Sequence, residues 1–135
     1  MTHYSACHIA DVFAAAAPAA FDLLQENQEA CKPSRPLTMV LFRSTGDGTV
    51  LYDGGYSQAV TGMPINFLGA KASFAKWASI DRCTGTPSAE DANGCSTYSS
   101  CADGVQVTLC TKQGGGHDYG SASVGWPILK SYVLP

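Results

Sequence analysis

Hydrophobic and polar positions along the chain alternate between strand-like and helix-like patterns. Residues 37–42 (LTMVLF) are apolar without interruption, as expected of a parallel strand buried on both faces, and residues 104–111 alternate like a strand. From about Asn66 onward, apolar residues recur at helical spacing. They predict a helix whose core-facing side carries Phe67, Ala70, Phe74, Trp77 and Ala78. Such alternation of strands and helices favours an α/β fold with a mostly parallel sheet and flanking helices.

Weaker patterns predict the remaining elements. Residues 1–10 are expected to be the end of a helix, and the apolar run at residues 12–20 a strand that Pro18 limits to its first half or ends. A capping-box-like opening predicts a short helix over residues 22–30. Pro127 is expected in the first turn of a final helix, because proline suits that position.

The cysteines indicate disulfides rather than a metal site. The six cysteines are an even number, and none of their spacings is the C-x-x-C of a zinc ribbon or a redox pair. Three structural disulfides imply export to an oxidising, extracellular compartment. The polar residues 81–104 hold three of the cysteines and are expected to form a long loop pinned by disulfides. The hypothesis for the pairing is Cys83–Cys110 and Cys95–Cys101 as local links, leaving Cys7–Cys31.

Composition narrows the classes of function. The 135 residues suit one domain, and with 14% charged residues, a net charge of −3 and no basic run, nucleic acid is not expected as a partner. The longest apolar stretch, residues 12–21, is too short to span a bilayer. Residues 1–20 lack the basic start of a signal peptide, so the natural N-terminus of this secreted chain is expected further upstream.

Two side chains that could perform chemistry follow the best strands. Asp47 lies in a Gly-rich turn after residues 37–42, and His117 lies in a GGGHD loop after residues 104–111. Functional groups of open α/β sheets gather at the carboxyl ends of the strands, and a carboxylate beside an imidazole is what a hydrolytic triad needs. From spacing alone, Asp47 as a turn residue and His117 as part of a plain connection remain alternatives.

Other candidate functional residues have weaker support from the sequence. His3 and His8 lie in the expected N-terminal helix and suit packing or surface positions. Asp53 precedes two glycines and competes as the acid, although a turn role suits it better. Ser57 in residues 55–59 (GYSQA) imitates a nucleophile turn but lacks the closing glycine and follows no expected strand, so it is discounted.

A family resemblance covers nearly the whole chain. Residues 43–55 (RSTGDGTVLYDGG) resemble the H-G-T-x-D-x-x-V-P-Y-x-G-G segment of secreted α/β-hydrolase esterases, the polyhydroxybutyrate depolymerases and related feruloyl and acetylxylan esterases. Residues 77–87 are similar to that family's W-x-x-x-x-x-C-x-G-x-P block, and residues 105–117 to its last strand and histidine loop. Residues 1–15 are similar to the segment directly after the nucleophile elbow.

The resemblance implies the C-terminal part of an α/β-hydrolase fold, one partial domain over residues 1–135. It implies a serine esterase with Asp47 as acid and His117 as base, no metal or cofactor, and an ester, polyester or polysaccharide-ester substrate. Arg43 and Ser44 stand where the family has His and Gly. The nucleophilic serine would lie upstream in a G-x-S-x-G turn. The chain alone is therefore expected to be inactive and to associate with the missing N-terminal half, not with a membrane.

Aromatic residues bear on the substrate and on the competing function. Tyr119 and Trp126 follow His117 closely and are candidates to line the substrate site, with packing of the last helix as the alternative for Trp126. The competing function is a non-catalytic, disulfide-stabilised secreted module that binds polymer or carbohydrate. Such a module should expose a row of aromatic side chains, whereas Phe67, Phe74 and Trp77 lie on the expected core stripe.

Overall fold

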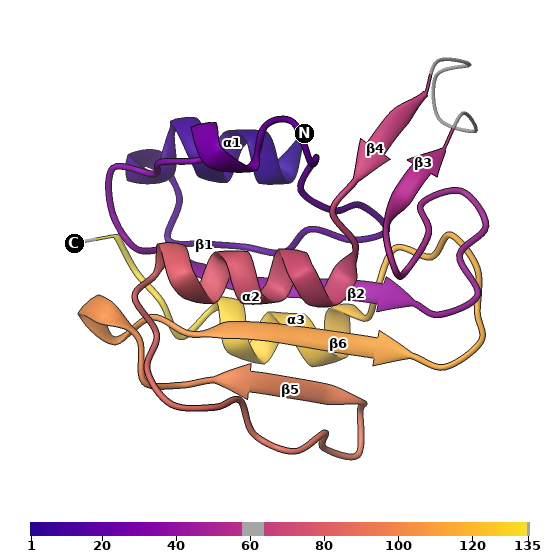
Figure 1. Cartoon of the computed structure of the whole chain (residues 1–135). Coiled ribbons are helices and arrows are strands. Elements are labelled where there is room, and N and C mark those ends of the chain that lie inside the picture. The colour runs from indigo at the N-terminus through magenta and orange to yellow at the C-terminus, as the bar shows by residue number, and fades with distance from the viewer. Residues whose placement is uncertain (58–63, 135) are drawn as a thin grey trace.

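The computed structural model describes residues 1–57 and 64–134. A four-stranded sheet with the strand order β1–β2–β6–β5 forms its centre (Figure 1). β1 (Ala15–Ala16), β2 (Thr38–Ser44) and β6 (Val107–Lys112) run parallel, and β5 (Cys95–Tyr98) runs antiparallel to β6. This mixed, mostly parallel sheet confirms the expected α/β class of fold.

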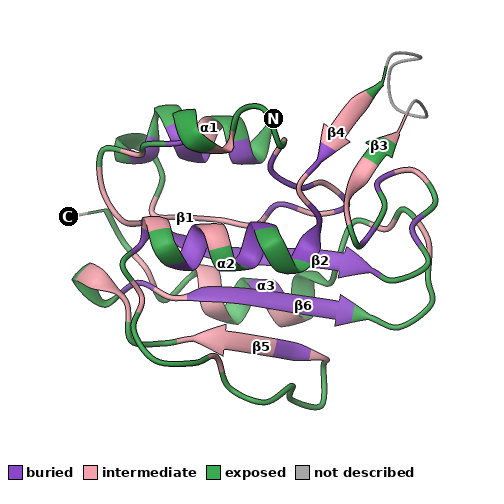
Figure 2. Cartoon of the chain, viewed as in Figure 1, coloured by how far each residue is buried: buried purple, intermediate pink, exposed green. Residues whose placement is uncertain are grey.

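Helices cover both faces of the sheet. α1 (Thr2–His8) and α2 (Ala70–Ile80) pack on one face, and α3 (Ala122–Leu129) packs on the other (Figure 1). All seven residues of β2 are consequently buried, which explains its continuous apolar run (Figure 2). Within the described ranges, no helix is both long and apolar enough to cross a membrane.

The two faces of β2 supply two separate hydrophobic clusters. Met39 and Leu41 join the larger cluster, in which Trp77 of α2 is fully buried. Val40 and Phe42 point the other way and pack against α3. Because alternate residues of a strand face opposite sides, one uninterrupted apolar segment serves both layers.

A hairpin that the sequence did not predict precedes α2. β3 (Gly55–Ser57) pairs antiparallel with β4 (Ile65–Phe67), so Phe67 lies in a strand and not on the helix, which begins after Gly69. Gly69 has a φ of 94°, and a Cβ there would lie 2.8 Å from the backbone of Asp53. This close backbone approach separates the hairpin from α2 and explains the late helix start.

The strand expected over residues 12–20 is reduced to β1. Beyond β1, only an isolated bridge from Ala19 to Phe42 continues the pairing with β2. Pro18 has no N–H to donate, and it joins this bridge through its carbonyl, which accepts a hydrogen bond from the Phe42 N–H at 3.0 Å.

The prediction of a short helix over residues 22–30 is wrong. Only a 3₁₀ turn forms there, at Gln28–Ala30. Asp22 does not cap a helix, because its side chain is fully buried against the guanidinium of Arg43. The Asp22 carboxylate therefore pairs with Arg43 and not with the backbone N–H groups that the capping pattern predicted.

Helix α3 begins earlier than its proline predicted. Pro127 lies inside α3 near its C-terminal end, so its expected position in the first turn is wrong. Val124 and Gly125 pack against Phe42, where a Cβ on the glycine would come within 3.1 Å of the ring. The turn of α3 that precedes Pro127 is therefore packed closely on β2.

Three disulfides reinforce the fold, and two of the three expected pairs are wrong. The expected loop contains a strand, β5, whose register with β6 places Cys95 directly opposite Cys110. These two are therefore bonded to one another, and not to Cys101 and Cys83 as expected. The observed pairs are Cys7–Cys31, which confirms the prediction, Cys83–Cys101 and Cys95–Cys110.

His3 is a buried packing residue that links α1 to α2. Trp77 donates its indole N–H to His3 Nδ1 at 3.0 Å, and His3 Nε2 lies 3.1 Å from the carbonyl oxygen of Phe21. These partners require a neutral ring with its proton on Nε2. Burial lowers the pKa of His3 to about 4, although the Phe21 carbonyl opposes this shift.

We expect His3 to make the fold acid-sensitive. The unfolded chain takes up a proton at His3 near pH 6.5 and the folded chain near pH 4, so this contribution is complete above pH 6.5 and lost as the pH falls to 4. At about 1.4 kcal/mol per pKa unit, the loss is roughly 3 kcal/mol. His3→Gln, which does not titrate, should lack this component in urea unfolding at pH 4 to 7. His8→Gln, at the exposed end of α1, is the control, and equal pH profiles for wild type and His3→Gln would contradict the assignment.

Asp81 joins the end of α2 to the start of β2. It follows the last residue of the helix, and its Oδ1 accepts a hydrogen bond from the backbone N–H of Leu37 at 3.1 Å. Its other oxygen, Oδ2, is buried and has no hydrogen-bond partner within residues 1–57 and 64–134. Burial raises the pKa of Asp81 to about 7, while the Leu37 N–H opposes the shift.

The charged form of Asp81 should therefore weaken the fold at neutral pH. The unfolded carboxyl loses its proton near pH 3.8 and the folded one near pH 7, so stability from this group falls across that window as the pH rises. Asp81→Asn keeps an acceptor for Leu37 and cannot ionise. Relative to wild type, its free energy of unfolding should rise by a few kcal/mol between pH 4 and 8. The exposed Asp53→Asn is the control, and a pH-independent difference for Asp81→Asn would refute this.

Candidate active site

Asp47 and His117 meet at one edge of the sheet. Asp47 lies in the turn after β2 and His117 in the loop after β6, and the two strands are parallel neighbours. His117 Nδ1 is 3.0 Å from Asp47 Oδ2 and 3.2 Å from Oδ1. The Asp47 side chain is 1% exposed, and that of His117 is 44% exposed. The structure thus brings the expected acid and base into contact.

The turn after β2 holds the carboxylate of Asp47 in place. Its Oδ1 accepts hydrogen bonds from the backbone N–H groups of Thr49 at 2.8 Å and Val50 at 2.9 Å. Burial alone would raise the pKa of Asp47, but the hydrogen bonds from Val50, Thr49 and His117 outweigh it and lower the pKa. Asp47 is therefore a fixed anion at neutral pH.

Backbone hydrogen bonds join the turn of Asp47 to the loop of His117. The N–H of Gly46 donates to the carbonyl of Gly114 at 2.9 Å, and the N–H of Gly114 donates to Thr45 Oγ1 at 2.8 Å. A Cβ on Gly46 would lie only 2.3 Å from the carbonyl oxygen of Gly115. The two segments approach so closely that only glycine fits at position 46.

A surface ion pair joins the two ends of the His117 loop. Lys112 Nζ lies 2.8 Å from Asp118 Oδ2, which also accepts from the N–H of Gly116 at 3.4 Å. The Lys112 ammonium, followed by the Gly116 N–H, lowers the pKa of Asp118. Both side chains are largely exposed, so the pair adds little stability and acts mainly on loop geometry.

The arrangement suits proton transfer. With Nδ1 turned to the Asp47 carboxylate, the neutral ring carries its proton on Nδ1 and has Nε2 free to accept another. A carboxylate in the position of Asp47 would stabilise the imidazolium that such a transfer forms. All six cysteines form disulfides, so no thiol is available as a nucleophile. Among the residues that the structure describes, no three His, Cys, Asp or Glu side chains form a group that could hold a metal ion.

The discounted candidates lie elsewhere. Asp53 is exposed in the turn before β3, and His8 is exposed at the end of α1. Ser57 Oγ donates to the carbonyl of Thr49 at 2.5 Å from within β3. The last two positions of the segment 55–59 lie outside the described residues.

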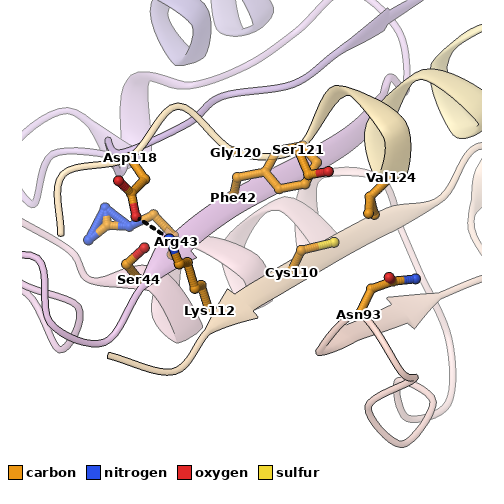
Figure 3. A pocket seen from close by; sticks show the side chains of 10 residues that line it. All are labelled: Phe42, Arg43, Ser44, Asn93, Cys110, Lys112, Asp118, Gly120, Ser121 and Val124. Carbon is orange, nitrogen blue, oxygen red and sulfur yellow. Dashed lines mark hydrogen bonds and ion pairs between the residues drawn. The ribbon is translucent and has the colours of Figure 1, made fainter. Parts of the chain in front are cut away.

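A cavity of about 400 Å³ lies beside the His117 loop, between the sheet and α3 (Figure 3). The Lys112–Asp118 pair stands at one end and Asn93 at the other, over a floor that includes Phe42 (Figure 3). Tyr119 and Trp126 are 93% and 62% exposed and do not line this cavity. Their contact with substrate stays a prediction.

Arg43 and Asp22 are parts of the site that the sequence did not assign. Arg43 Nη2 donates to the carbonyl of Val50 at 2.7 Å and lies 3.3 Å from Asp22 Oδ2, with both side chains fully buried. The only sign of Arg43 in the sequence is that a charged residue directly follows the apolar run at residues 37–42. The pattern does not reveal its partner, because Asp22 reads locally as a helix cap.

Gly46→Ala should separate the acid from the base. The new methyl group would push the carbonyl of Gly115 and the His117 loop outward, and it should cost about 1–3 kcal/mol of stability. The NMR signal of the His117 Nδ1 proton should move as its contact with Asp47 is lost. Gly48→Ala in the same turn, where a Cβ meets nothing within 4 Å, is the matched control. An unchanged Nδ1 signal in folded Gly46→Ala would show that the close approach does not hold the pair.

Comparisons with known proteins find similarity to a feruloyl esterase. No family profile and no solved structure matches the chain. Over 138 aligned residues, the chain is 48% identical to Feruloyl esterase B of Piromyces equi, and the match covers 100% of this chain and 26% of that protein. The chain therefore spans about a quarter of the length of the curated relative that it matches. Along its whole length, it is similar to part of an esterase.

Proposed function

We propose that this chain carries the acid and the base of a secreted serine esterase with an α/β-hydrolase fold. The observation that carries the proposal is the contact between Asp47 and His117 at the carboxyl ends of β2 and β6. The similarity to a feruloyl esterase supports ester hydrolysis as the chemistry. The order of acid before base along the chain is that of α/β-hydrolases, and three disulfides fit an oxidising compartment.

In the proposed mechanism, His117 Nε2 removes the hydroxyl proton of a serine contributed by a segment upstream. The serine oxygen attacks the ester carbonyl and forms a tetrahedral intermediate. His117 then gives that proton to the leaving alcohol as the C–O bond breaks. Water, deprotonated by the same nitrogen, attacks the acyl-enzyme, and the proton passes back to the serine as the acid is released.

Asp47 contributes through its charge and its fixed position. It holds the proton of His117 on Nδ1 and stabilises the imidazolium formed in each half-reaction. Because three hydrogen-bond donors already fix the carboxylate, little reorganisation is needed when the ring becomes charged.

The proposed substrate is a carboxylic ester of the kind named for the relative, a feruloyl ester. The wider substrate class is esters of polysaccharides or polyesters. Tyr119 and Trp126 are exposed near His117 in the chain and would contact such a substrate outside the cavity of Figure 3.

A chimera tests this function directly. Replacing the matching residues of the Piromyces equi esterase with this chain should retain hydrolysis of methyl ferulate, because the two sequences align over the whole chain. His117→Ala and Asp47→Ala in the chimera should each lower kcat by about 10⁴-fold or more, with little change in KM. The chain alone should show no turnover above background.

The control is His8→Ala, which removes an exposed imidazole far from the site in sequence and should leave kcat unchanged. A folded chimera that keeps its activity after His117→Ala would refute the assignment of the base. An inactive chimera whose chain binds insoluble polysaccharide equally well with and without Asp47 and His117 would instead favour the non-catalytic binding module.

A further inference from the structure

A buried ion pair lies under the turn that holds Asp47. Arg43 and Asp22 are both fully buried, with Nη2 of the guanidinium 3.3 Å from Oδ2 of the carboxylate. Asp22 follows the segment that bridges to β2, and Arg43 is the penultimate residue of β2 itself. The pair therefore connects the first part of the chain to the strand end from which the acid projects.

Most of the polar side-chain atoms of this pair lack the hydrogen bonds that a stabilising buried ion pair needs. Arg43 Nε and Nη1 and both oxygens of Asp22 are buried and have no hydrogen-bond partner among the residues that the structure describes. Burial raises the pKa of Asp22 to about 7 even though Arg43 opposes the shift. Replacing a buried ion pair with apolar side chains of similar size is often neutral or stabilising. Stability alone thus gives no reason for charged residues here.

The Arg43 side chain makes a well-formed hydrogen bond to the backbone of Val50. Arg43 Nη2 donates to the Val50 carbonyl at 2.7 Å, while the Val50 N–H donates to Asp47 Oδ1 at 2.9 Å. Val50 is itself fully buried. Both backbone polar groups of this residue are therefore engaged, one by the guanidinium and one by the acid.

We propose that Arg43 is a positioning residue for the acid: it fixes the Val50 backbone, and Asp22 serves as its buried counter-ion. The guanidinium orients Val50, Val50 and Thr49 hold Asp47, and Asp47 holds the imidazole of His117. The catalytic consequence rests on the proposed esterase function. The coupling between Arg43 and Asp47 does not, since it is a property of the folded chain.

A charge-balanced variant separates positioning from stability. Arg43→Met together with Asp22→Leu removes one positive and one negative charge and replaces the pair by apolar side chains. The relief of burying two poorly satisfied charges should offset the lost hydrogen bond to the buried Val50 carbonyl, so the midpoint of thermal unfolding of the folded double variant should differ little from that of wild type. Exchange of the Val50 amide should be roughly tenfold faster, and the pKa of the Asp47 carboxyl, followed by NMR, should rise toward its ordinary value.

Two further variants keep the result decisive. Met39→Leu changes the far end of β2 and should leave the Val50 amide and Asp47 unaltered. If the double variant does not fold, Arg43→Met alone is measured at pH 5.5, where Asp22 can take up a proton and become neutral. Unchanged Val50 exchange and an unchanged pKa of Asp47 in whichever variant folds would overturn the proposal.

Neither readout requires turnover, so failure of the esterase assay leaves the positioning role standing, and the reverse also holds. In an active chimera, the double variant should lower kcat by about 10- to 100-fold with KM nearly constant, because misplacement of the acid affects the proton transfer and not binding. Wild-type kcat in a chimera whose Val50 amide exchanges faster would limit Arg43 to a structural role.

Discussion

The parallel pairing of β2 with β6 is the constraint on which the site depends. Six consecutive residues of each strand are in register, from Met39 with Val107 to Ser44 with Lys112. Both strands therefore end at the same level, and the turn and the loop that follow begin side by side. Since β5 pairs with the other edge of β6, and β1 with the other edge of β2, neither strand can slip without breaking further hydrogen bonds. The strand register brings Asp47 and His117 together, and the hydrogen bonds of the Asp47 side chain then fix their contact.

The buried ionisable groups of this small core have opposite effects on the stability of the fold as the pH changes. The neutral imidazole of His3 favours the fold as the pH rises from about 4 to 6.5, whereas the buried carboxyls of Asp22 and Asp81 favour it as the pH falls from about 7. The opposing slopes overlap in weakly acidic solution and partly cancel there. Asp47 differs from these groups, because its hydrogen bonds keep it charged through the same range.

The sequence predicted what depends on local pattern and strand order. The apolar run of β2 and the alternating pattern of β6 identified the central strands, and the loops that follow these strands pointed to Asp47 and His117. The hairpin β3–β4 and the strand β5 were missed because each strand is short and pairs only in the folded chain, and because Phe67 of β4 also fits the helical spacing that continues into α2. The missed β5 also gave two wrong disulfides. Asp22 was misread because a carboxylate before a helix-like pattern gives no sign of a buried Arg43.

The contact between Asp47 and His117 also closes a loop of the chain. The two residues are 70 positions apart, and the segment between them includes the hairpin β3–β4, which projects away from the sheet (Figure 1). The entropy of closing a long loop grows only slowly with its length, so extra residues in such a projection add little cost. Residues inserted into this hairpin are therefore expected to leave the strand ends in place. The fold separates a part that must keep its geometry from a part in which evolution can vary length and sequence.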